Sequence, residues 1–161
     1  MSQPSPETTN ISSDLGRRGE QLAAAYLDQI GFQIVAGNFI VPVGRNRVGA
    51  TVQVEIDLVA YDGPVLCFVE VKTRASDWFA PPSANVDLRK QRQVTRAARA
   101  YRRMFGLLED PYRFDVVSIV LPPTDRETVA EAAKGFQIEL LRDFWSEEKF
   151  RKRWSSAIYW D

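Results

Sequence analysis

The chain has 161 residues, 45% of them hydrophobic and 26% charged, and its 21 Lys and Arg residues balance 21 Asp and Glu residues. This composition is typical of a folded domain and excludes a wholly disordered, collagen-like or membrane-spanning chain. The chain contains no histidine. Triad catalysis through histidine, a histidine-ligated zinc ion and a histidine general base are therefore excluded. Any chemistry must use carboxylates, lysine, hydroxyls or a hard metal ion.

The ends of the chain differ from its middle in composition. Residues 1–13 are rich in Ser, Thr, Pro and Asn and have neither the basic nor the apolar segment of a secretion signal. The single cysteine, Cys67, cannot form an internal disulfide, which agrees with a reducing compartment. We therefore expect a cytoplasmic protein without a membrane partner, with a disordered tail over 1–13, one folded domain over 14–142 and an aromatic extension over 143–161.

The first third of the chain predicts a helix, a strand and a loop. Apolar residues recur at helical spacing over 14–30, after a capping residue and before a glycine. A short apolar stretch over 32–38 predicts a strand. Residues 42–50 are rich in Gly, Arg and Asn and predict an exposed basic loop, whose arginines are Arg45 and Arg47.

The rest of the chain predicts four more strands and two helices. The strands are expected over 51–61, 65–74 and 113–121 and from Phe136 onward; the helices are expected over 85–105 and 126–134. The strand over 51–61 should keep its alternate residues from Val52 to Ala60 on one face. Beyond Arg142 the pattern weakens. This order of elements predicts an α/β fold with a mixed sheet flanked by helices.

The helix predicted over 85–105 carries two contrasting faces. Its apolar face is expected to contain Val94, Ala97, Ala98, Tyr101, Met104 and Phe105, and the opposite stripe contains Arg89, Arg92, Arg96, Arg99 and Arg103. Lys90 falls on the apolar, sheet-facing side, so its ammonium group must point toward something polar. The arginine stripe, with Arg45 and Arg47, is a candidate phosphate-binding surface; the alternative is an ordinary solvated face.

Charged residues cluster in the hairpin predicted over 51–74. Glu70 and Lys72 share one face of the second strand, and Glu55 and Asp57 share one face of the first. A two-residue turn at Asp62-Gly63 would place Glu55 opposite Glu70, with Asp57 diagonal to it. A three-residue turn would instead send the two carboxylate pairs to opposite faces. Since Asp-Gly favours the two-residue turn, we expect one polar site.

Clustered carboxylates repel one another unless a cation lies between them, and hard oxygen ligands suit Mg²⁺ or Mn²⁺. Such an ion, with Lys72 beside it, would permit phosphodiester hydrolysis without histidine. The alternative is that these side chains form ordinary cross-strand salt bridges on a solvated hairpin. Two features favour the site: Phe68 shares a face with Glu70, and Lys90 lies on the sheet-facing side of its helix.

Several blocks of residues resemble, in order and approximate spacing, the YraN family of bacterial endonuclease-like proteins. The blocks are Gly16-x-x-Gly19-Glu20, Ala23, Leu27, Gly31, Asn38, Glu55-Ile56-Asp57-Leu58-Val59, Phe68-Val69-Glu70-Val71-Lys72-Thr73-Arg74, Lys90-Gln91 and Arg113-Phe114-Asp115-Val116-Val117. The resemblance covers about residues 14–119. It implies a restriction-endonuclease-like fold of the PD-(D/E)xK superfamily, similar to Holliday junction resolvases, with an αβββαβ core and a nuclease-like domain over 14–142.

The resemblance also implies roles for individual residues. Glu20, Asp57 and Glu70 would hold a metal ion and take part in catalysis, Lys72 would be the catalytic lysine, and Lys90, Gln91 and Glu55 would support the site. Glu20 has an alternative explanation as a glutamate in the first turn of its helix, where the helix dipole favours negative charge.

We therefore expect a divalent-metal-dependent endonuclease that hydrolyses phosphodiester bonds in DNA, with branched or structured DNA as a candidate substrate. Mg²⁺ or Mn²⁺ is the expected cofactor, DNA the expected partner, and a homodimer is a candidate assembly. One alternative is a nucleic-acid-binding module of the same fold without useful turnover. Another is a protein-interaction adaptor built around the aromatic C-terminal residues. Salt-dependent DNA binding separates the first two functions from the third.

Overall fold

The structure, a computed structural model, describes residues 6–75, 86–121 and 135–154. In chain order its elements are α1 (Pro6–Gln29), β1 (Gln33–Arg45), β2 (Thr51–Asp62), β3 (Val65–Ala75), α2 (Leu88–Met104), β4 (Tyr112–Leu121), β5 (Gln137–Trp145) and α4 (Glu148–Trp154). The helix predicted over 126–134 lies outside the described residues.

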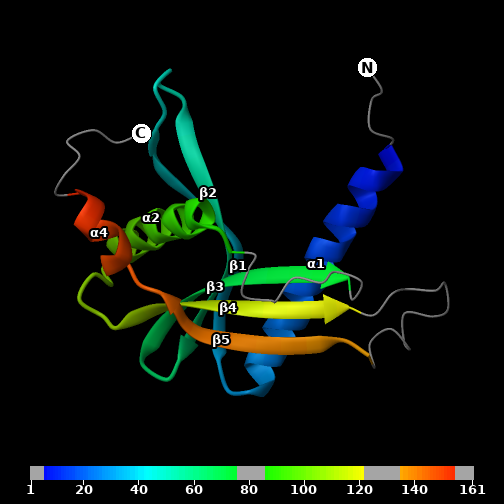
Figure 1. The fold of residues 1–161 in the computed structure, drawn as a ribbon. Helices are drawn as coiled ribbons and strands as arrows, with labels where there is room; N and C mark the ends of the chain where they lie inside the picture. The colour runs from blue at the N-terminus through cyan, green and yellow to red at the C-terminus, as the bar shows by residue number, and fades with distance from the viewer. Residues whose placement is uncertain (1–5, 76–85, 122–134, 155–161) are drawn as a thin grey trace.

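The strands form one sheet in the order β1-β2-β3-β4-β5, in which β3 and β4 are parallel and every other neighbouring pair is antiparallel. Because a parallel pair requires a crossover, the chain passes from β3 through α2 to β4. α1 covers one face of the sheet, and α2 and α4 lie on the other (Figure 1). This mixed sheet flanked by helices confirms the expected fold class and is consistent with a restriction-endonuclease-like core.

Each face of the sheet has its own hydrophobic core. Leu66 and Phe68 of β3 pack against α2, whereas Cys67 and Val69 pack against α1. This alternation follows the period-two pattern of the strand, and β4 is buried on both faces as its continuous apolar run predicts. The charged residues Glu70 and Lys72 continue the face that carries Phe68, so the α2 side of the sheet changes from apolar to polar along β3.

The turn between β2 and β3 lies one residue later than expected. Asp62 pairs with Val65, so the two turn residues are Gly63 and Pro64. Gly63 has φ +57°, and the fixed φ of proline follows it, which suits a type II′ turn with glycine in its first central position. The pairing shifts by two residues relative to the expected register, which brings Asp57 rather than Glu55 toward Glu70. A shift of two keeps every side chain on its face.

The segment predicted as a basic loop over 42–50 is strand in its first part, over 42–45, and a turn over 46–50. β1 continues to Arg45, and only a tight turn separates it from β2. The Asn46 Oδ1 atom accepts hydrogen bonds from the backbone N–H groups of Val48 and Ala50, which closes that turn. The composition of this segment predicted a loop because the segment includes the end of a two-stranded arm, formed by β1 and β2, that projects from the sheet beside α2 (Figure 1).

The described ends of the domain extend beyond the expected boundaries. α1 begins at Pro6, within the segment expected to be a disordered tail. β5 crosses residue 142, and Trp145 and Phe150 are buried in the α2-side core. Among the helices in the described residues, none is both long and apolar enough to cross a membrane.

The buried apolar face of α2 is shorter than the sequence predicts. Val94, Ala97, Ala98 and Tyr101 are buried as expected. Met104 and Phe105 are about half exposed at the C-terminal end of the helix. The ring of Phe105 still contacts that of Tyr101, with ring centroids 4.6 Å apart.

Candidate metal centre

The site forms where β2 and β3 separate. Their pairing runs from the turn to Leu58, which pairs with Val69. Beyond this point the backbone N–H of Val71 donates to the Asp57 Oδ2 atom at 2.8 Å. The Asp57 carboxylate thus takes the place of a main-chain acceptor and lies in the opening between the two strands.

The face pattern of β2 breaks at the same residue. Ile56 lies in the α2-side core, yet Leu58 lies in the α1-side core, although residues two apart in a regular strand share a face. The expectation that alternate residues from Val52 to Ala60 share one face is therefore wrong across Asp57. Because of this break, the Asp57 side chain can be approached from both sides of the sheet.

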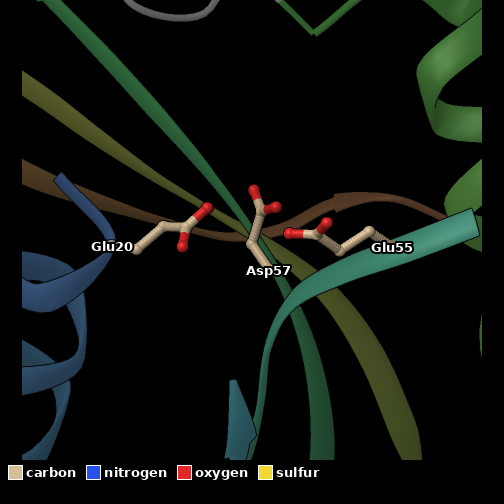
Figure 2. Close-up of side chains that lie close together, drawn as sticks. All are labelled: Glu20, Glu55 and Asp57. Carbon is tan, nitrogen blue, oxygen red and sulfur yellow. The ribbon is translucent and has the colours of Figure 1, made fainter. Parts of the chain in front are cut away.

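From the α1 side, Glu20 reaches Asp57 and Glu55. One carboxylate oxygen of each of these three residues lies within 4.8 Å of the others, and Figure 2 shows the three groups directed toward a common point. Gly19 permits this approach, since a Cβ atom there would lie 1.8 Å from Thr73 Oγ1 on β3. Only a glycine lets α1 pack this closely on β3 and deliver the next residue, Glu20, to the cluster.

From the α2 side, two lysines approach Glu70. The Nζ atom of Lys72 lies 3.5 Å from Glu70 Oε1, and that of Lys90 lies 3.7 Å from the same oxygen. Glu70 is 2% exposed, and its Oε2 atom has no hydrogen-bond partner among the described residues. A buried carboxylate oxygen without a partner is rare in folded proteins because its desolvation is costly.

The electrostatics of the site oppose ionisation of two of its acids, Asp57 and Glu20. Burial, followed by the nearby charge of Glu70, raises the pKa of Asp57 from 3.8 to about 7, although the Val71 N–H and Lys90 act to lower it. Burial also raises the pKa of Glu20, with additional repulsion from Asp57 and Glu55. Like charges are thus held together at a position where a cation would relieve the repulsion.

The residues present fit a hard divalent cation. Every available ligand is a carboxylate oxygen, which Mg²⁺ and Mn²⁺ prefer, and Glu70 contributes an oxygen that the protein leaves unsatisfied. Asp57 is part of the cluster with Glu20 and Glu55, and the charge of Glu70 also raises its pKa. Asp57 therefore connects that cluster to Glu70. Asp57 and Glu70, with Glu20 or Glu55, are therefore the residues able to hold an ion.

Other predicted site residues lie elsewhere. The amide of Gln91 donates to the Val86 carbonyl at 2.9 Å and accepts from Lys149 Nζ at 3.0 Å, so it joins the start of α2 to α4. Arg45, at the end of the β1–β2 arm, donates to the Gly49 carbonyl. Arg47, on the same arm, is exposed.

The arginine stripe of α2 is divided between surface and structure. Arg89, Arg92 and Arg103 are exposed. Arg96 donates to the Val43 carbonyl at 3.0 Å, and Arg99 pairs with Glu147. Together with Pro42, Val43, Thr95 and Ala100, the arginines Arg96, Arg99 and Arg103 line a surface hollow of about 450 Å³ between β1 and α2.

Two features were not predicted from the sequence. The first is Glu147, 5% exposed, which accepts hydrogen bonds from Arg99 and Tyr112 and lies 3.8 Å from Arg102 Nη1. No periodicity reveals it, because the pattern weakens before residue 147. The second is Asn38, which donates to both Glu20 and Glu55. Asn38 is one of the residues that carry the family resemblance, but no role was predicted for it, although an asparagine inside a strand is unusual.

Comparisons with known proteins agree with the resemblance. A family model described as uncharacterised protein family UPF0102 matches residues 19–119. A UPF0102 protein of Geobacter sulfurreducens is 38% identical over 135 residues, covering 84% of this chain and 98% of the relative. A UPF0102 protein of Chlorobium chlorochromatii is 40% identical over 140 residues, covering 86% of this chain and 97% of the relative. The chain therefore belongs to UPF0102, the YraN family.

Proposed function

We propose that this protein is a divalent-metal-dependent endonuclease that hydrolyses phosphodiester bonds in DNA. The observation that carries the proposal is the meeting of Asp57 with Glu70 where β2 and β3 separate. There burial and the charge of Glu70 raise the pKa of Asp57 to about 7, and Glu70 Oε2 has no hydrogen-bond partner among the described residues. Lys72 and Lys90 pair with Glu70 Oε1, but no cation among the described residues lies against the buried Glu70 Oε2 atom, which supports a ligand there rather than a purely structural cluster of salt bridges.

The proposed role of each residue follows from the position of its side chain. Asp57, Glu70 and Glu20 would hold Mg²⁺ or Mn²⁺, which supplies water activation and charge stabilisation at phosphorus. Lys72, 31% exposed by its side chain, has its ammonium group at the mouth of the site and can bind a phosphate oxygen. Lys90 approaches Glu70 from α2 and places a positive charge 3.7 Å from that buried carboxylate.

The DNA backbone would lie against the hollow between β1 and α2. This hollow is lined by Arg96, Arg99 and Arg103, two of which are oriented by bonds to Val43 and Glu147. Arginines held in one geometry lose less entropy when they bind a phosphate. Arg45 at the end of β1 and Arg47 in the turn that follows add positive charge on the projecting arm, which favours a polyanion over a small neutral substrate.

A cleavage assay tests the proposal. The purified full chain is incubated with duplex, single-stranded and four-way-junction DNA, each with Mg²⁺, Mn²⁺ or EDTA. We expect cleavage of at least one DNA form with either metal and none in EDTA. Asp57→Asn, purified in parallel, controls for contaminating nucleases and should be inactive. Faster cleavage of the four-way junction than of its duplex arms would identify branched DNA as the substrate.

Two results would replace the proposal. Salt-dependent DNA binding without cleavage in any metal would make the protein a nucleic-acid-binding module. An absence of DNA binding at low salt would contradict both nucleic-acid functions and leave the interaction-adaptor alternative.

A further inference from the structure

Asn38 occupies an unusual backbone position beside the acidic cluster. Its φ is +51°, in the left-handed region that residues other than glycine seldom adopt, although Asn and Asp tolerate it best. Its two neighbours in β1 pair with the two residues that flank Asp57 in β2, so Asn38 lies across the ladder from Asp57. The side chain is exposed, so burial in a core does not explain this conformation.

The Asn38 amide joins two acids from different elements. Its Nδ2 atom donates to Glu20 Oε2 on α1 and, at 2.8 Å, to Glu55 Oε1 on β2. Both hydrogens of the amide nitrogen are thereby used. A lysine or arginine at this position would also hold the two acids together, but its charge would compete with a cation for them. A neutral donor positions the carboxylates and leaves their negative charge in place.

We propose that Asn38 is a positioning residue that preorganises the acidic cluster for a divalent cation. The inference rests on the proposed metal-dependent function and adds to it a residue to which that function assigned no role. The left-handed backbone turns the side chain toward the cluster, and the two hydrogen bonds hold Glu20 and Glu55 at one separation before the ion arrives. Partners of metal ligands commonly change metal affinity by about 10- to 100-fold when removed.

Two substitutions separate this role from a backbone role. Asn38→Gly removes the side-chain amide, and glycine adopts the left-handed conformation readily. Asn38→Asp keeps a side chain of the same size that also tolerates this conformation, but it replaces the amide donors with a fourth carboxylate. Asp143 provides a matched control, because its φ is +52° and its exposed side chain lies on β5. Asp143→Gly therefore makes the same backbone change in another strand.

The measurements are the Mn²⁺ dissociation constant by calorimetry and the melting temperature in EDTA and in Mn²⁺. We expect Asn38→Gly to weaken Mn²⁺ binding about tenfold and to reduce the Mn²⁺-induced rise in melting temperature. Asn38→Asp should lower the melting temperature in EDTA, through repulsion, and enlarge the Mn²⁺-induced rise above that of the wild type. Asp143→Gly should leave Mn²⁺ binding unchanged.

Each contrary result has a distinct meaning. Wild-type-like Mn²⁺ binding in Asn38→Gly, or equal Mn²⁺-induced rises in both Asn38 variants, would overturn the role of Asn38 while the metal centre stands. A wild-type protein that binds no Mn²⁺ would overturn the metal centre itself, and the positioning role with it.

Discussion

Two buried carboxylate centres of this protein have opposite surroundings. At the first, Asp57 meets Glu70, its pKa is raised to about 7, and Glu70 retains an unpartnered oxygen among the described residues. At the second, Glu147 accepts bonds from Arg99 and Tyr112. Burial works to raise the pKa of Glu147, but the Tyr112 hydroxyl and the Arg99 guanidinium outweigh it and lower that pKa below the usual value.

The difference separates a site suited to ligand binding from one suited to stability. Glu147 also lies 3.8 Å from Arg102 and 3.6 Å from Arg151, so positive groups surround it, and it connects the segment before α4 to α2. The Asp57 centre gathers like charges, an arrangement that costs folding energy unless a cation is bound. Substitutions at the two centres should therefore act on different properties of the protein.

The largest expected effect is loss of catalysis at the Asp57 centre. Asp57→Asn removes a metal ligand and Lys72→Ala removes a positive charge that binds phosphate, so each should lower the cleavage rate at least about a hundredfold. Asp57→Asn should leave the melting temperature in EDTA unchanged or raise it, because it relieves repulsion with Glu70. The exposed Asp110→Asn serves as the control. A large loss of stability with retained cleavage would mean that the cluster is structural.

The Glu147 centre should show the reverse pattern. Glu147→Gln replaces a charged acceptor with a neutral one beside three arginines and should lower the free energy of unfolding by about 2 kcal/mol. Urea unfolding followed by tryptophan fluorescence measures this change, and the cleavage rate should stay within a few fold of the wild type. Glu148→Gln, at the exposed neighbouring position, is the matched control. Unchanged stability would remove the distinction between the two centres.

The two centres should also respond oppositely to pH in the metal-free protein. The folded-state pKa of Asp57 is raised from 3.8 to about 7, so its protonation adds stability that is fully present below pH 4 and lost as the pH rises through 7. The pKa of Glu147 is lowered from 4.5, so its contribution is present above that value and lost as the pH falls below it. Melting temperatures in EDTA between pH 4.5 and 8 should fall with pH in the wild type and less in Asp57→Asn. A wild-type curve parallel to that of Asp57→Asn would contradict the raised pKa.

The smallest expected effect concerns arginines that line the hollow between β1 and α2. Each phosphate contact contributes about 0.9 to the slope of log affinity against log salt on duplex DNA, so Arg96→Gln combined with Arg103→Gln should reduce that slope by about 2. Fluorescence anisotropy at several salt concentrations measures it. The exposed Arg18→Gln on α1 tests whether any lost positive charge has the same effect. An unchanged slope would make the hollow a solvated surface.

Much of this architecture could be predicted from the sequence alone because its signals are local. Helical spacing, period-two alternation and turn residues predicted α1, β2, β3, α2 and β4, and the resemblance placed Asp57, Glu70 and Lys72 in one family motif. The helical position of Lys90 predicted a polar target, and the structure places its Nζ atom 3.7 Å from Glu70. The predictions of helices and strands needed only residues that lie within a few positions of one another, whereas the grouping of Asp57 with Glu70 and Lys72 came from the family resemblance.

Only the tertiary structure decided how those residues meet. The turn at Gly63 and Pro64 shifted the register by two, and the break in the face pattern at Asp57 depends on the separation of β2 from β3. Gln91 was expected at the site, yet it bonds to Val86 and Lys149. Register and contacts between distant segments depend on packing across the whole sheet, and no spacing within one segment encodes them.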